Sequence, residues 1–229
     1  MANLQTSSFE ALKRRQKARN IWQEFTEWLR LHPSPRWVFR GQSQNWPLKP
    51  TVGRSKKFLP EKELLLLNFF KRSALPFVSS ALLQNNWDWL SVAQHHGLPT
   101  RLIDWTTNPL AAAFFATEAS ARGKKDGVII AVRPRDLAVY KPEQGGEIAP
   151  FEISKPGFFY PSALASRIIA QRGLFSRSNT DKFIVPADVK EDIRRILFSV
   201  GVDHAQLMAD LDGISNTLRW RYENGVAFE

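Results

Sequence analysis

The first 32 residues carry the longest helical pattern of the chain. Apolar side chains return at intervals of three and four between residues 8 and 31, as one face of an α-helix requires. The opposite face is strongly basic, and the pattern stops near His32-Pro33, where proline ends a helix. We therefore predict an N-terminal amphipathic helix within residues 1–32. Its core-facing side chains are Phe9, Leu12, Ile21, Trp22, Phe25, Trp28 and Leu29.

A second helical pattern runs from residue 60 to about residue 83 and is interrupted at Pro76. The run 64–67, together with Phe69 and Phe70, is apolar almost all round. Helices that are apolar on every side are normally buried. The pattern therefore predicts one long, deeply buried helix with a break at the proline.

Two shorter helices are expected on either side of residue 100. The first begins near Asn86, which together with Asp88 is able to cap it, and ends at Gly97, a residue suited to the left-handed position after a helix. The second begins at Asn108-Pro109 and continues through the small residues 111–119. Its many alanines allow the backbone of a neighbouring strand to approach closely.

Strand patterns are short and are separated by Gly and Pro. Residues 127–134 form the clearest one, apolar on both faces and so predicted to be central in a sheet. Trp37 to Phe39 are β-formers, and their strand is expected to end at Arg40-Gly41. Further strands are predicted at 100–106, 167–172 and 182–186, and around Ile148 and Phe151 in the loop-rich segment 136–160.

Residues 187–223 are expected to be helical, with a cap at Gly201 and a break at Asp212-Gly213. Neither a linker nor an internal repeat separates these segments. The chain is therefore predicted to be a single α+β domain, in which residues 33–229 pack with the N-terminal helix as one globular unit.

Arg101 and Asp104 stand in the otherwise apolar strand 100–106. Burying a charge without a partner costs several kcal/mol or shifts its pKa. Two explanations remain open from the sequence: an internal ion pair that fixes the strand to a helix end, or a polar functional site.

The composition narrows the class of protein. Among 229 residues, 43% are hydrophobic and 24% charged, which is ordinary for a folded domain. No cysteine is present, which excludes disulfides, thiolate metal sites and cysteine nucleophiles. Adjacent histidines such as His95 and His96 do not converge on a helix, so we expect no metal site. No apolar run suits a membrane span or a signal peptide, and we expect a cytoplasmic protein.

The formal net charge is +10. Such a charge favours anionic partners, namely nucleic acid, nucleotides or an acidic protein. The basic residues are nevertheless scattered over many short clusters, and solvated helix faces account for most of them.

Two motifs resemble the FRG domain family: FRGQ at residues 39–42 and AQHHGLPTRLIDWTTNPLAAAFFA at residues 93–116. The likeness covers roughly residues 36–217. Its further segments are RIIAQRGLFS (167–176), IVPADVK (184–190) and ADLDGIS (209–215).

The order of the expected elements is similar to that of ADP-ribosyltransferases, which implies a split β-sheet core surrounded by helices. In that superfamily, a first-strand Arg-Gly binds NAD, a second strand carries hydroxyl residues, and a later strand carries a glutamate. Carried over, Arg40-Gly41 match the first motif, and Thr106 with Thr107 stands in the second. Gln171 takes the last position, where a neutral side chain cannot stabilise a cationic transition state; Asp104 is the alternative carboxylate.

The resemblance implies catalytic roles for Arg40, Asp104, Thr106 and Gln171. Arginine offers a bidentate fork to phosphates, and glycine leaves a backbone edge open to a nicotinamide amide. Trp46 or Trp105 is expected to stack on a ring of the ligand. The residues expected to bind NAD, which is a substrate here rather than a resident cofactor, are Arg40, Gly41, Gln42, His96, Arg101 and Trp105.

Three functions remain open from the sequence. The first is an ADP-ribosyltransferase-like enzyme that binds NAD and transfers ADP-ribose to a protein or nucleic-acid acceptor, or hydrolyses NAD, in a bacterial defence or toxin setting. The second is a non-catalytic nucleotide or nucleic-acid binding module, favoured by the positive charge and the eight tryptophans. The third is a partner-binding domain in which the polar cluster is a buried network. The oligomeric state is not predicted.

Overall fold

The computed structural model describes residues 2–54, 56–78, 83, 85–118, 124–140, 150–152, 157–159, 168–171 and 180–228. Helices account for 51% and strands for 16% of the structure. The chain is therefore an α+β protein with small sheets, as the sequence pattern predicted. Within the described ranges, no helix is both long enough and apolar enough to cross a bilayer.

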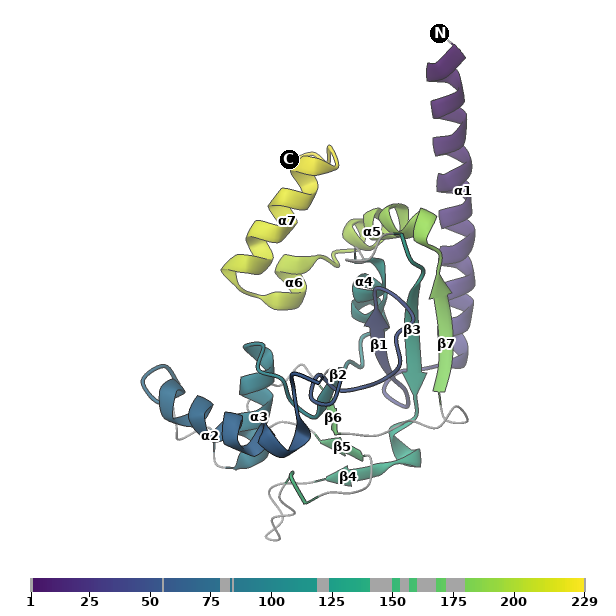
Figure 1. Cartoon of the computed structure of the whole chain (residues 1–229). Helices are drawn as coiled ribbons and strands as arrows, with labels where there is room; N and C mark the ends of the chain where they lie inside the picture. The colour runs from purple at the N-terminus through teal and green to yellow at the C-terminus, as the bar shows by residue number, and fades with distance from the viewer. Residues whose placement is uncertain are drawn as a thin grey trace.

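The first sheet is antiparallel, in the order β1 (Val38–Gln42), β3 (Gly127–Val132) and β7 (Thr180–Val185). Every residue of β3 is buried, which confirms its predicted central place. Three helices cover one face of this sheet: α1 (Ala2–Leu31), α4 (Pro109–Thr117) and α5 (Lys190–Ser199) (Figure 1). Helix α1 supplies buried Ala18 and Phe25, and the predicted apolar stripe faces the core from Ile21 to Leu29. Its first part does not, because Phe9 and Leu12 are 56% and 66% exposed.

The second sheet has the order β2 (Leu102–Trp105), β6 (Ile168–Gln171), β5 (Gly157–Phe159) and β4 (Ala138–Tyr140). Its β4–β5 pair is parallel and its other pairs are antiparallel. One isolated bridge joins the two sheets, between Phe39 at β1 and Thr106 just after β2. Apolar side chains of both sheets pack together around Val38, Ile103 and Trp105.

Helix α2 (Glu63–Ala74) follows the short 3-10 turn Pro60–Lys62 and ends just before the break predicted at Pro76. The continuation predicted beyond the proline falls largely on residues 79–82, which lie outside the described residues. The predicted deep burial is wrong: Leu65 and Phe69 are 55% and 58% exposed, and only Glu63 and Leu67 of the helix are buried. Among the described residues, α2 packs against α3 and buries Leu67 there, while its other apolar side is left uncovered.

Helix α3 (Asn86–His95) begins and ends through local hydrogen bonding. The cap is Asn85, one residue earlier than expected, whose side chain accepts from the amides of Trp87 and Asp88. Gly97 has a φ of +86°, which confirms the left-handed residue after the helix. At the start of α4, Asn108 accepts from the amides of Leu110 and Ala111, as a cap preceding Pro109 should.

The C-terminal part contains a 3-10 turn (Ala187–Val189), α5, α6 (His204–Met208) and α7 (Leu211–Glu223). The break between α6 and α7 falls at left-handed Ala209 and the capping Asp210, before the expected Asp212-Gly213. A further 3-10 turn covers Pro134–Asp136. Phe151 lies in a turn, so the strand expected there is wrong, and Ile148 lies outside the described residues.

Candidate functional site

Strands β1 and β2 meet at one point and then separate. Phe39 and Thr106 exchange two backbone hydrogen bonds of 2.7 and 2.8 Å. Continuing this register would set Gly41 opposite Asp104, but the bridge is an isolated one and the pairing stops before them. Because backbone groups alternate along an antiparallel strand, the amide and carbonyl of Gly41 point away from β3, toward this gap.

Arg40 reaches across the gap. Its Nη1 donates to the carbonyl oxygen of Asp104 at 2.7 Å. Its Nε is buried and has no hydrogen-bond partner among the described residues. Burial lowers the pKa of Arg40, the negative charge of Asp104 opposes this, and the nearby charge of Arg54 adds to it. The guanidinium stays protonated, as arginine does in proteins, and therefore presents an unused donor in a gap flanked by a second cation.

Gln42 lies two residues further along the same face of β1. It is only 6% exposed, and its side-chain carbonyl oxygen has no partner within the described part of the chain. Buried polar atoms in folded proteins nearly always have a partner, protein, water or ligand. Arg40 and Gln42 thus form a row of two side chains with unmet hydrogen-bonding capacity.

The carboxylate of Asp104 is held by a residue that sequence reasoning missed. Gln94, on the last turn of α3, donates from Nε2 to Asp104 Oδ1 at 2.6 Å. The amide oxygen of Gln94 in turn accepts from the hydroxyl of Thr100. This relay fixes the Asp104 carboxylate beside α3. The available signal was the position of Gln94 in the same QHHG segment as the predicted histidine.

Arg101 has a structural partner. Glu63 accepts from the Arg101 amide at 2.6 Å and from its Nε at 2.7 Å, and Pro150 accepts from Nη1 at 2.8 Å. Glu63 is 1% and Arg101 6% exposed. The geometry favours the ion-pair explanation for Arg101, which ties the start of β2 to the start of α2, over a role in ligand binding.

Three other residues predicted to belong to the site, Trp105, Thr106 and His96, are not among the hydrogen-bond partners of Arg40 and Asp104 described above. Trp105 is 2% exposed and meets the ring of Phe158 edge-on, so its faces are core contacts rather than a platform for a ligand ring. The hydroxyl of Thr106 accepts from the amide of Asn108 and shapes the turn into α4. His96 is exposed at the end of α3.

Gly41 is a glycine because of helix α4. A Cβ built on Gly41 would lie 1.8 Å from the carbonyl oxygen of Ala112, and one on Gly127 would lie 2.0 Å from that of Ala116. Helix packing, rather than a ligand on that side, therefore accounts for the missing Cβ. The alanines of α4 and the two glycines together allow close helix–sheet packing, and the open feature of Gly41 is its backbone edge at the gap.

Gln171 is placed by its backbone alone. It pairs with Leu102 on one side and Gly157 on the other. Asp104 pairs with Ile169 on the same strand, two residues before Gln171. Arg40, Asp104 and Gln171 therefore lie on neighbouring strands β1, β2 and β6.

Residues 43–59 connect β1 to α2 and are referred to as the basic loop. Leu48 packs on the core between the sheets, and Val52 is 4% exposed. Lys190 of α5 holds the start of the loop by donating to the carbonyl of Ser43 at 2.5 Å, and burial lowers its pKa. Four cations of the loop are exposed: Lys49, Arg54, Lys56 and Lys57.

The described residues contain no group of three His, Asp or Glu side chains that could hold a metal ion. The site is thus built from arginine, carboxylate, amides and a backbone edge.

These features lie in a region that is similar to a known domain family. Residues 35–125 match the FRG domain. The matched region holds β1, the basic loop, α2, α3, β2 and α4, and with them Arg40, Gln94 and Asp104. Strands β3, β6 and β7 and the C-terminal helices lie beyond it. No curated protein and no solved structure matches the chain.

Proposed function

We propose that the FRG region binds an NAD-type dinucleotide in the gap between β1 and β2, and that it acts on it as an ADP-ribosyltransferase-like enzyme or NAD hydrolase. One observation carries the proposal: Arg40 sits in this gap with its buried Nε unpartnered among the described residues, beside the backbone edge of Gly41. Two small sheets that separate next to an Arg-Gly pair are what the resemblance to ADP-ribosyltransferases leads one to expect.

The pyrophosphate is assigned to Arg40 and its neighbour Arg54. Two positive charges close together repel each other, and an anion bound between them offsets this repulsion. Arginine also binds phosphate oxygens through charge-assisted hydrogen bonds. The carboxamide of nicotinamide carries one donor and one acceptor, which match the carbonyl and amide of Gly41. Of the two tryptophans considered for stacking, Trp105 is 2% exposed and excluded, and Trp46 is 40% exposed.

The chemistry is assigned to Asp104. In the reaction, the bond between ribose C1′ and the nicotinamide nitrogen breaks, and its electron pair leaves with nicotinamide, which becomes neutral. Water or an acceptor atom then supplies a new pair to C1′ and releases its proton to solvent. A carboxylate near the sugar stabilises the positive charge that develops on the way. Gln94 holds Asp104 for this task.

The alternative is a module that binds the nucleotide without cleaving it. Two observations favour it: the position expected for a glutamate holds Gln171, and one oxygen of Asp104 already accepts from Gln94. Both features weaken the negative charge available to a cationic transition state. The two functions share the same binding residues and differ only in turnover.

Substituting Arg40 and Asp104 separates binding from chemistry. Arg40→Gln should weaken NAD binding, measured by calorimetry, by about tenfold or more, the loss expected for a charged hydrogen bond worth roughly 1.5–3 kcal/mol. The control Arg36→Gln removes an exposed arginine four residues away and should leave affinity unchanged. Asp104→Asn should keep NAD affinity and reduce nicotinamide release by about 100-fold or more.

Each outcome decides one part of the proposal. Wild-type protein that binds NAD but releases no nicotinamide, with or without protein and nucleic-acid acceptors, would establish the non-catalytic alternative. Absence of NAD binding, or equal losses for the Arg40 and Arg36 variants, would refute the site. Thermal melts of every variant show whether the fold is retained.

A further inference from the structure

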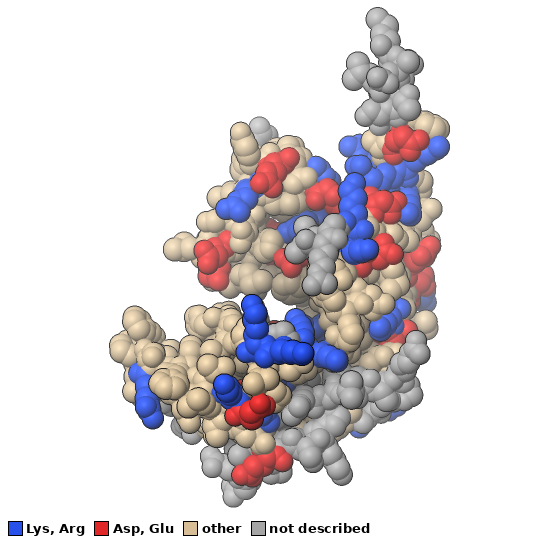
Figure 2. Space-filling view, viewed as in Figure 1, with Lys and Arg blue, Asp and Glu red and all other residues tan. Residues whose placement is uncertain are grey.

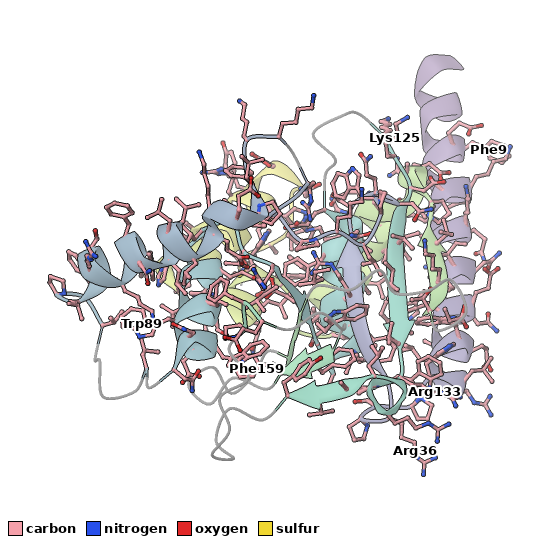
Figure 3. The ribbon with its side chains drawn as sticks, turned by 60° about the horizontal axis from the view of Figure 1, so that its bottom comes forward. Phe9, Arg36, Trp89, Lys125, Arg133 and Phe159 are labelled. Atoms are coloured by element: carbon pink, nitrogen blue, oxygen red, sulfur yellow. The ribbon has the colours of Figure 1, made fainter. Side chains whose placement is uncertain are left out.

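The basic clusters of the sequence differ in what surrounds them. On α1, Arg14 contacts Asp192 at 2.5 Å and Lys17 contacts Asp188 at 2.7 Å, so much of this cluster is neutralised by the α5 region. Arg195 approaches Glu191 at 3.8 Å. Lys125 and Arg133 lie just beyond opposite ends of β3, and Figure 3 shows them well separated. These residues therefore do not form one surface.

The basic loop is different. Residues 41–60 contain no Asp or Glu, while four cations fall within residues 49–57. Within the described ranges, Lys49, Arg54 and Lys56 take part in no ion pair with an acidic side chain. Lys182 extends the loop surface by donating to the side chain of Asn45 at 3.0 Å. As far as the described residues go, the charges of Lys49, Arg54 and Lys56 are therefore not neutralised by a carboxylate.

The basic loop also lies in a hollow. Figure 2 shows Lys and Arg side chains gathered over the segment between β1 and α2, in a recess between the α2–α3 part and the C-terminal helices. A flat bilayer surface reaches a recess poorly, whereas a flexible strand can enter it. Trp46 on the same loop exposes 40% of its surface, and an exposed indole offers a face to a base.

We propose that the basic loop docks a single-stranded nucleic acid, through phosphate contacts of Lys49 and Lys56 and stacking on Trp46. Arg54 lies close enough to Arg40 for its charge to affect the pKa of Arg40. The docked strand would therefore pass beside the gap between β1 and β2. That the docked strand accepts ADP-ribose rests on the function proposed above. Binding of the strand to the basic loop does not require NAD.

Binding is measured by fluorescence anisotropy with labelled 12-nucleotide RNA, DNA and duplex DNA, and with poly-glutamate as an acidic-protein competitor. The loop variant Lys49→Gln, Lys56→Gln should lose about fivefold or more in affinity. A control variant with the same charge change, Lys13→Gln, Arg15→Gln, should bind within about twofold of wild type. For single strands each phosphate contact adds about 0.7 to the salt slope, so the loop variant should lose about 1.4 from it. Trp46→Ala should weaken single strands and spare duplex binding.

Equal losses in the loop and control variants would reduce the effect to net charge and overturn the proposal. Tighter binding of duplex than of single strands, or complete competition by poly-glutamate, would overturn it as well. Arg40→Gln should keep nucleic-acid binding while losing NAD, so failure of the nucleotide site and failure of the basic loop give different results. RNA and DNA arms show which strand is preferred.

Discussion

At the residue scale, the two charged residues at β2, Arg101 just before it and Asp104 within it, have separate partners and separate tasks. Arg101 forms a buried ion pair with Glu63. Asp104 lies at the gap, where its backbone carbonyl accepts from Arg40 and its carboxylate accepts from Gln94. A buried pair of this kind contributes little relative to an apolar pair, but removing one partner leaves an uncompensated charge. The pair therefore fixes geometry more than it adds stability.

Glu63→Ala should lower the free energy of unfolding by about 3–5 kcal/mol, because Arg101 then remains buried without its partner. The double variant Glu63→Leu, Arg101→Met should recover most of this loss. Urea denaturation followed by circular dichroism measures both. A loss for Glu63→Ala of under about 1 kcal/mol would show that water reaches Arg101 and that the pair is not locked.

At the element scale, helix α4 sets how closely the first sheet can be approached. Its buried alanines lie against Gly41 of β1 and Gly127 of β3, at distances that leave no room for a Cβ. The position of β1 on α4 in turn fixes where β1 separates from β2. Local packing of a small-residue helix thus places the gap that holds Arg40.

Gly41→Ala should destabilise the unliganded protein by about 3 kcal/mol or more, because a methyl group meets rigid backbone and the strand must shift. The matched control is Gly201→Ala, where φ is +80° and nothing lies within 4 Å of the added Cβ. That change should cost about 1–2 kcal/mol from the left-handed backbone alone. Thermal unfolding ranks the two, and an equal or smaller loss at Gly41 would contradict the packing explanation.

At the scale of the whole molecule, one half-buried cluster joins the C-terminal helices to the rest of the fold. His204 of α6 accepts at Nδ1 from Arg194 of α5 at 3.0 Å and donates from Nε2 to Glu118, after α4, at 3.2 Å. Arg194 also stacks over Phe114, and Trp220 of α7 lies beside it. Burial and the Arg194 charge lower the pKa of His204, and Glu118 opposes them. The cluster favours neutral histidine.

This arrangement predicts the direction of a pH effect. Because the folded-state pKa of His204 lies below its ordinary value of about 6.5, the unfolded chain binds more protons there. The contribution of neutral His204 to the free energy of unfolding is complete above about pH 6.5. It is lost as the pH falls from there toward the lower, folded-state pKa. Chemical denaturation between pH 5 and 8 should show this loss, and His204→Gln should remove part of it. Equal pH dependence in both proteins would count against the cluster.

The sequence by itself determined the elements of this protein and much of their burial. Periodicity in hydrophobic positions predicted α1, β3, α3 and α4, because repeats of 2 and 3.6 residues are local properties of the backbone. The motif residues around Arg40 and Asp104 pointed to the FRG family, which residues 35–125 match. Asn108 and Gly97 marked helix ends through local hydrogen bonding and backbone conformation.

Only the tertiary structure decided which faces are covered and which charges are neutralised. The apolar run of α2 predicted burial, yet Leu65 and Phe69 remain exposed because no element packs on that side within the described residues. Glu63 pairs with Arg101 across 38 positions, and Gln94 binds Asp104 through the path of α3. Basic residues of α1 meet Asp188 and Asp192, whereas Lys49 and Lys56 of the basic loop meet no acidic side chain in the described part of the chain. Such pairings depend on contacts between distant segments, which local periodicity does not encode.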